Sequence, residues 1–242
     1  EMSSFGFASR GSGLGGSSSF LISLLCSLAA TKNKNLNNSE LAEIASNIEI
    51  NWLNKPIGKQ DQYICSSGGM SLFKYEKSKV GEIKLSPEKQ KTIESIIDRL
   101  FIVPSQITRS ADNVLKKLKF EDDSQKKIRE LRAIAEKFLF AEESRDYILE
   151  SKFHEAVKSS WEIKKEMSGV MNEKLIEQYD YLKKIPSNWI RLLGAGSGGF
   201  FLICPSLTPS ETEIYFNKLG ISEYTKASMS LSGVELLHKY DE

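Results

Sequence analysis

The stretch RGSGLGGSSSF, residues Arg10 to Phe20, holds four glycines and four serines and runs directly into the apolar segment FLISLL. Glycine allows backbone N–H groups to approach a ligand closely. A helix that begins after such a loop directs the positive end of its dipole at any anion there. A flexible linker has a similar composition, but a linker would continue into further low-complexity sequence rather than into a hydrophobic helix.

The loop matches common nucleotide motifs only in part. Gly11, Gly13 and Gly16 satisfy G-x-G-x-x-G, but no second strand ending in an acidic residue follows, as a dinucleotide site requires. A Walker loop requires Gly-Lys-Ser/Thr, and this loop has no lysine. The same glycine pattern recurs at residues 194–199, where the following FFLIC is typical of a strand instead of a helix.

Two interpretations of the first loop therefore stay open. In one, backbone N–H groups and the hydroxyls of Ser17, Ser18 and Ser19 bind phosphate, or a Mg²⁺ ion that accompanies phosphate. In the other, the glycines form a structural tight turn.

The composition is that of an ordinary globular protein, with 242 residues, 40% hydrophobic residues and a net charge of +1. This charge balance argues against a nucleic-acid or anionic membrane partner. The three cysteines, Cys26, Cys65 and Cys204, are widely spaced and predict a reduced, cytoplasmic protein. No apolar run is long enough to span a membrane. We expect a monomer or a homodimer.

The periodicity predicts an α+β fold whose second half is rich in helix. A change in composition near residues 82–88 predicts two domains, 1–85 and 86–242. The expected helices cover 20–30, 38–53, a segment that starts at Ser86-Pro87, several pieces between 110 and 182, and a segment that starts at Thr208; the expected strands cover 3–10, a hairpin in 68–85, 99–105, 200–204 and part of 223–236.

Two carboxylates attract attention because phosphoryl transfer needs charge neutralisation and a group that orients the acceptor hydroxyl. Glu49 lies near the end of the second expected helix, and Asp61 follows after a Pro/Gly turn in GKQDQY. Glu49 would bind a metal, Asp61 would bind the acceptor, and the neighbouring Lys59 would keep Asp61 ionised. The alternative is that both carboxylates are surface charges.

The segments GSGLGGSSS, GKQDQY with GGMSLF, and LLGAGSGGFFLI, in this order, resemble the conserved segments of the GHMP kinases. SSWEIKKEM and the short third segment are most similar to the branch that phosphorylates D-glycero-D-manno-heptose 7-phosphate. The resemblance implies a two-domain fold. Its N-terminal part is similar to domain 2 of ribosomal protein S5, and its helix-rich C-terminal part is ferredoxin-like.

The resemblance also implies the site. Asp61 would be the catalytic residue, and Ser17 and Glu49 would bind Mg²⁺. The acceptor would be a sugar phosphate, near which Gly196 of the third motif would pack. The phosphate of the acceptor requires cations, and the candidates are Lys59, Arg109 and Arg191, the last two chosen from their charge and placement. The ATP phosphates would be bound by Gly11, Ser12, Gly13, Leu14, Gly15, Gly16, Ser17 and Ser18.

The implied reaction transfers the γ-phosphoryl group of ATP to the anomeric hydroxyl of a sugar phosphate. Two alternatives are a kinase for an unphosphorylated sugar of the fucose or galactose type and a non-catalytic descendant that binds sugar or nucleotide. The sequence departs from the family in several places. Gly16 replaces the usual first serine, Ser197 replaces a glycine, and the first family motif is absent, so the chain resembles such a kinase without roughly its first third.

Overall fold

The computed structural model describes residues 14–76, 79–107, 122–141 and 146–237. The chain forms two compact units. The first contains Leu14–Leu85 and the segment from Met229 onward, and the second contains Ser86–Ser228. The strand expected at 3–10 lies outside the described residues. None of the described helices is long and apolar enough to cross a membrane.

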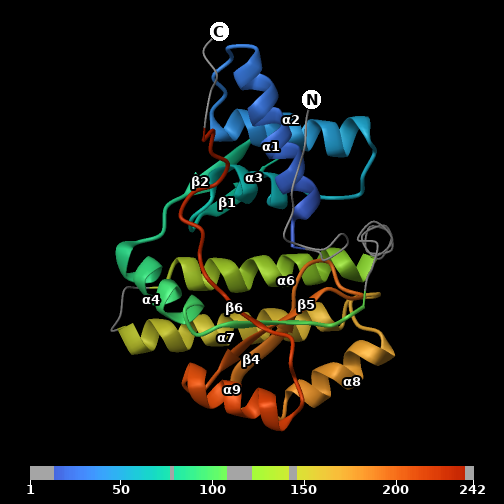
Figure 1. The fold of residues 1–242 in the computed structure, drawn as a ribbon, viewed down its shortest axis with the longest axis vertical. Helices are drawn as coiled ribbons and strands as arrows, with labels where there is room; N and C mark the ends of the chain where they lie inside the picture. The colour runs from blue at the N-terminus through green and yellow to red at the C-terminus, as the bar shows by residue number, and fades with distance from the viewer. Residues whose placement is uncertain (1–13, 77–78, 108–121, 142–145, 238–242) are drawn as a thin grey trace. The chain divides into compact units, whose positions relative to one another are not determined.

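The first unit is built from three α-helices, a short π-helix and a β-hairpin (Figure 1). Strands β1 and β2 are antiparallel and pair Leu72 with Ile83. The elements are α1 (Gly16–Thr31), α2 (Asn38–Asn47), the π-helix η1 (Ile48–Trp52), α3 (Gln60–Ser67), β1 (Leu72–Tyr75) and β2 (Val80–Ile83).

Local sequence explains why α2 begins where it does. The side chain of Asn37 accepts a hydrogen bond from the backbone N–H of Glu40, and Glu40 accepts one from the N–H of Asn37. This reciprocal arrangement satisfies donors that the first helical turn leaves unpaired. Leu41 of α2 then packs with Ile22 of α1 in a small apolar core.

The C-terminal segment packs on the first unit beyond α3. The N–H of Gly69 donates to the carbonyl of Ser230 at 2.8 Å, and the N–H of Val234 donates to the carbonyl of Ser66 at 3.3 Å. The strand expected within residues 223–236 is only two residues long. It is β6 (Thr225–Lys226), which ends before the segment that starts at Met229.

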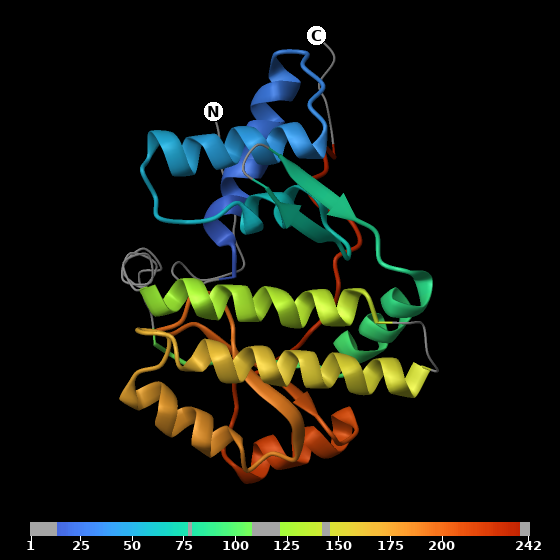
Figure 2. The same ribbon diagram turned by 180° about the vertical axis from the view of Figure 1, so that it is seen from behind.

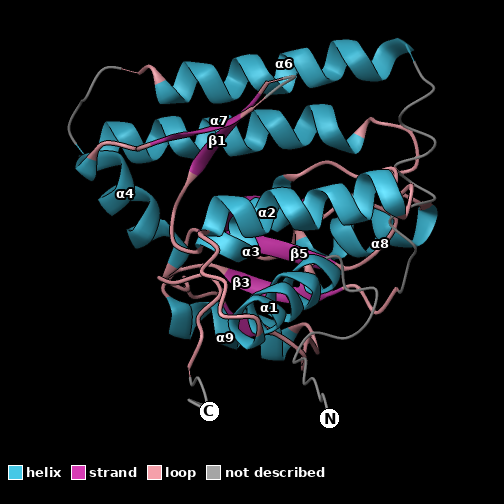
Figure 3. Ribbon diagram, turned by 90° about the horizontal axis from the view of Figure 1, so that it is seen from above, coloured by secondary structure: helices cyan, strands magenta, loops and turns pink. Residues whose placement is uncertain are grey.

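The second unit has a four-stranded antiparallel sheet in the order β4-β5-β3-β6, with helices on both faces (Figures 1 and 2). Its remaining elements are α4 (Pro87–Ile97), β3 (Phe101–Pro104), α6 (Asp122–Leu139), α7 (Asp146–Lys165), α8 (Glu173–Leu182), β4 (Ser187–Leu192), β5 (Phe200–Pro205) and α9 (Pro209–Lys218). Helices α6 and α7 run side by side (Figure 3).

Alternation along the strands divides the core of this unit into two layers. Ile190 and Ile203 are paired across β4 and β5, and they pack with Phe216 of α9. The next pair, Trp189 and Cys204, points to the opposite face and packs against α4 and α7. The sheet is therefore covered on both faces.

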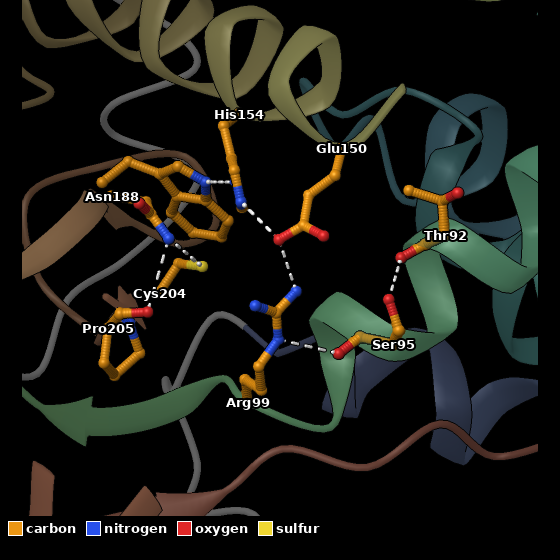
Figure 4. Close-up of polar contacts among 9 residues, drawn as sticks. Thr92, Ser95, Arg99, Glu150, His154, Asn188, Cys204 and Pro205 are labelled. Atoms are coloured by element: carbon orange, nitrogen blue, oxygen red, sulfur yellow. Dashed lines mark hydrogen bonds and ion pairs between the residues drawn. The ribbon is translucent and has the colours of Figure 1, made fainter. Parts of the chain in front are cut away.

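A polar network lies on the α4 and α7 face (Figure 4). The indole N–H of Trp189 donates to Nδ1 of His154 at 2.9 Å, and Nε2 of His154 lies 3.3 Å from Glu150 Oε1. Because the indole N–H can only donate, Nδ1 carries no proton and the ring hydrogen faces Glu150. Arg99 closes the network with a bond of 2.7 Å to the same carboxylate oxygen, so α4, α7 and β4 are tied together.

The ion pair between Arg99 and Glu150 makes the free energy of unfolding depend on pH. Its hydrogen bond holds the pKa of Glu150 below the usual value, against the opposing effect of burial. A lowered folded-state pKa means that the stabilisation is present above the unfolded-state pKa and is lost as pH falls through the folded-state value.

Glu150→Gln is therefore expected to lower the free energy of unfolding by about 0.5–1 kcal/mol at pH 7. The difference from the wild type should shrink as pH falls through the lowered folded-state pKa of Glu150, because protonated glutamate is neutral like glutamine. Urea unfolding at several pH values measures this. Glu155→Gln, an exposed change on the same helix, is the control. If Glu150→Gln lowered the free energy of unfolding equally at low and neutral pH, the result would contradict the role of the Arg99–Glu150 pair.

Candidate functional site

The glycine-rich loop ends at the start of α1. Gly15 is the N-cap residue, with φ of 73°, a left-handed conformation that favours glycine. Gly15 has no side chain to cap the helix, and the first turn carries no acidic residue. The N–H groups of the first turn therefore point out of the helix as donors for an anion. The structure also explains how Gly16 can replace a serine, since a Cβ there would meet nothing within 4 Å.

Two hydroxyls of this first turn meet one carboxylate. Ser17 Oγ donates to Glu49 Oε1 at 3.1 Å, and Ser18 Oγ donates to Glu49 Oε2 at 3.0 Å. Glu49 is 2% exposed, whereas Ser17 is exposed. The two residues predicted to bind a metal are thus in direct contact, although they are 32 positions apart in the sequence.

Glu49 reaches this position from η1, where the helix widens and the N–H of Leu53 bonds the carbonyl of Ile48. Two further side chains hold the carboxylate. Lys55 Nζ lies 2.8 Å from Oε1, and Gln62 Nε2 donates to Oε2 at 2.5 Å. Burial raises the pKa of Glu49, but the hydrogen bonds from Lys55, Gln62 and Ser18 outweigh it, so the pKa is lowered and the group stays ionised.

Asp61 lies in the first turn of α3, against the end of the glycine-rich loop. A Cβ built on Gly15 would lie 3.9 Å from both Cβ and Cγ of Asp61 and 3.7 Å from Cys65 Sγ. Burial and the charges of Asp61 and Glu49 raise the pKa of the Cys65 thiol to about 11. The exposed Asp61 carboxylate, the neutral Cys65 thiol and Gly15 therefore share one region within the first unit.

Lys59 contacts the carboxylate of Glu43 on α2. Its Nζ bonds both oxygens of Glu43, at 2.9 and 2.7 Å, and the hydroxyl of Tyr63 donates to the same group. Burial and this bond to Glu43 raise the pKa of Tyr63 to about 12. Lys59 thus forms an ion pair with Glu43 of α2, and its expected effect on Asp61 stays a prediction. Its role in substrate binding stays a prediction.

The third glycine-rich segment connects β4 and β5 in the second unit. The N–H of Ser197 donates to the carbonyl of Val170 at 2.7 Å, and Ser197 Oγ donates to that of Gly169 at 2.6 Å. Gly196 has φ of 107°, and a Cβ there would lie 2.5 Å from the Val170 Cα. Close packing of backbone on backbone therefore explains the glycine, whatever the segment binds.

Arg191 precedes this segment on β4. Its side chain shares a sheet face with Trp189, and burial lowers its pKa. Its Nε is buried without a hydrogen-bond partner among the described residues. Arg191 and Gly196 stay predictions as substrate-binding residues. The other predicted residues, Gly11, Ser12, Gly13 and Arg109, lie outside the described residues, and Leu14 is 40% exposed.

The donor set around Glu49 suits Mg²⁺ bound together with phosphate. Mg²⁺ prefers oxygen ligands, and at nucleotide sites it takes only one or two carboxylates because phosphates and water complete its shell. Glu49 and Ser17 supply such oxygens. Among the described residues no group of three His, Cys, Asp or Glu side chains could hold a metal ion by itself. The residues thus fit a metal that a nucleotide helps to bind.

Comparison with known proteins agrees with this geometry. Residues 8–69, which include Gly15, Ser17, Glu49 and Asp61, match the family model of the GHMP kinases N terminal domain. Over these residues the chain is similar to the N-terminal domain of the GHMP kinases. It is also 27% identical over 201 residues to the D-glycero-alpha-D-manno-heptose 7-phosphate kinase of Campylobacter jejuni, a match that covers 81% of the chain.

Solved structures show the same fold. The mevalonate kinase of Methanococcus jannaschii aligns with a TM-score of 0.67 and 16% identity, over 92% of this chain and 66% of that one. A D-glycero-D-manno-heptose 1-phosphate kinase from B. thetaiotaomicron aligns with a TM-score of 0.63 and 18% identity, over 93% and 63%. The expected α+β, GHMP-kinase-like fold is thereby confirmed. The chain spans 59% of the length of its curated relative from C. jejuni.

The sequence pointed to Ser17, Glu49 and Asp61, but it gave no signal for the two other partners of Glu49. Lys55 lies six positions after Glu49, a spacing that does not match the three or four residues of a regular α-helix. Gln62 follows Asp61 directly, so only the orientation of α3 reveals that its side chain turns toward Glu49.

Proposed function

We propose that the chain belongs to an ATP-dependent sugar kinase that phosphorylates the anomeric hydroxyl of a sugar phosphate, with D-glycero-D-manno-heptose 7-phosphate as the preferred acceptor. The proximity of Asp61 to Gly15 carries this proposal, since a Cβ added at Gly15 would lie 3.9 Å from Asp61. It brings the acidic residue near the start of an uncapped helix within one unit. The sequence similarity to a heptose 7-phosphate kinase supports the choice of acceptor.

In the proposed reaction the first-turn N–H groups of α1 bind and orient the phosphates of ATP. Asp61 accepts the proton of the anomeric hydroxyl. The hydroxyl oxygen forms a bond to the γ-phosphorus while the bond from that phosphorus to the β–γ bridging oxygen breaks, and ADP leaves.

Mg²⁺, when bound with ATP, would neutralise charge on the phosphate oxygens, and Ser17 and Glu49 would hold it. Gln62 and Ser18 would keep the Glu49 carboxylate in place through their hydrogen bonds at 2.5 and 3.0 Å. The carboxylate therefore needs little reorganisation when the substrate binds.

The test is ADP release from the full chain with Mg²⁺ and ATP over a panel of sugars. Each sugar is supplied with and without a phosphate at the end distal from the anomeric carbon. We expect turnover that depends on that phosphate and on a free anomeric hydroxyl. Equal turnover with free galactose or fucose would instead favour a kinase for unphosphorylated sugars, and ATP binding without turnover on any sugar would favour a non-catalytic descendant.

A further inference from the structure

A cation of the protein itself already lies at the predicted metal ligands. The ammonium of Lys55 is 2.8 Å from Glu49 Oε1 and 3.2 Å from Ser17 Oγ. The same two oxygens are 3.1 Å apart. Lys55 therefore contacts both atoms assigned to Mg²⁺, and its side chain is 29% exposed while that of Glu49 is 2% exposed.

This arrangement balances charge locally. The single negative charge of Glu49 faces one positive charge, and its second oxygen accepts from two neutral donors, Ser18 and Gln62. A divalent ion added beside the ammonium would lie within a few ångströms of another cation in a partly buried place, where repulsion is weakly screened. To coordinate a metal, Ser17 Oγ would also need the lone pair that accepts the hydrogen bond from the Lys55 ammonium.

We infer that Lys55 is a built-in counter-ion of the metal site, one that occupies the Ser17–Glu49 oxygens until a divalent cation displaces it. The inference rests on the proposed function, because it takes this oxygen pair as the metal site. It adds that the chain keeps Glu49 ionised and positioned without metal, at the cost of weaker metal binding. The apparent affinity for the metal equals the intrinsic affinity multiplied by the fraction of molecules in which Lys55 is off the site.

Lys55→Met tests this, since methionine retains an unbranched side chain without the charge. Titration of the full chain with Mn²⁺ alone, followed by the electron paramagnetic resonance signal of free Mn²⁺, is expected to show roughly tenfold tighter binding than in the wild type. Lys55→Arg keeps a cation that can pair with Glu49, so its Mn²⁺ affinity should stay near that of the wild type.

Lys74→Met is the matched control. It removes the same charge from the same unit, but Lys74 pairs with Glu76 on the hairpin rather than with Glu49. Its Mn²⁺ affinity should equal that of the wild type. Unchanged or weaker Mn²⁺ binding by Lys55→Met would overturn the inference, as would an equal gain in Lys74→Met.

Thermal unfolding separates this role from a purely structural one. Lys55→Met leaves Glu49 without its counter-ion, so its melting temperature should fall in metal-free buffer and recover with Mg²⁺ more than that of the wild type does. If Mg²⁺ does not reduce the loss in melting temperature of Lys55→Met, the result would contradict the inference. The measurements need no sugar, so a chain that shows these metal effects but phosphorylates no sugar of the panel would refute the proposed function and leave the role of Lys55 supported.

Discussion

Replacing Asp61 with asparagine is expected to lower the turnover number of phosphoryl transfer by a factor of about 10²–10⁴. Asparagine retains the shape of the side chain but cannot accept the proton of the acceptor hydroxyl. The affinity for ATP should change little, because the first-turn donors of α1 and the Ser17–Glu49 pair are untouched. A loss in turnover without a loss in ATP binding marks a group that acts only in the transition state.

Steady-state kinetics with the preferred sugar and ATP binding by calorimetry measure the two quantities separately. Asp98→Asn is the control, because Asp98 is an exposed residue at the end of α4 in the second unit. Turnover of Asp61→Asn at the wild-type level would show that another group takes the proton.

A second large effect is expected from Gly68→Ala. Gly68 has φ of +64°, and a Cβ there would lie 2.1 Å from the Ser232 carbonyl carbon and 2.2 Å from the Gly233 nitrogen. Alanine therefore meets a strained backbone conformation and a collision with main chain, which cannot move aside as a flexible side chain can. We expect a loss of about 2–4 kcal/mol in the free energy of unfolding.

Calorimetry gives the overall change, and hydrogen exchange locates it. The amide of Gly69, which bonds Ser230, should exchange faster in Gly68→Ala. Gly81→Ala serves as the control, since a Cβ at Gly81 meets nothing within 4 Å and its φ lies outside the left-handed region. Equal melting temperatures for the two variants would mean that the C-terminal segment can shift to admit a methyl group.

Features that depend on neighbouring residues could be predicted from the sequence. Ser86 caps α4 with Pro87 at its first position, and Thr208 forms a capping box with Glu211 at α9, both as expected. These signals are local, because a cap needs a side chain only three residues from the amide that it satisfies. The same holds for the hairpin, where β1 and β2 lie within the expected segment.

Features that depend on distant pairing could not be predicted in this way. The tail at 223–236 has an alternating pattern, but only Thr225 and Lys226 find a partner strand, since β3 offers pairing at Phe101 and Ile102 alone. Lys59 stands beside Asp61 in the sequence yet bonds Glu43 on another helix. A strand or an ion pair requires a partner, and its choice is settled by how the elements pack.

The return of the chain end to the first unit affects the order in which the protein can fold during synthesis. On the ribosome, α1 to β2 emerge early, but the carbonyl of Ser66 and the amide of Gly69 have no backbone partners until Val234 and Ser230 have been made. The nascent N-terminal unit must therefore wait, incomplete, while the whole of the second unit is translated. Its hydrogen bonds at Ser66 and Gly69 can form only after Ser230 and Val234 have been translated.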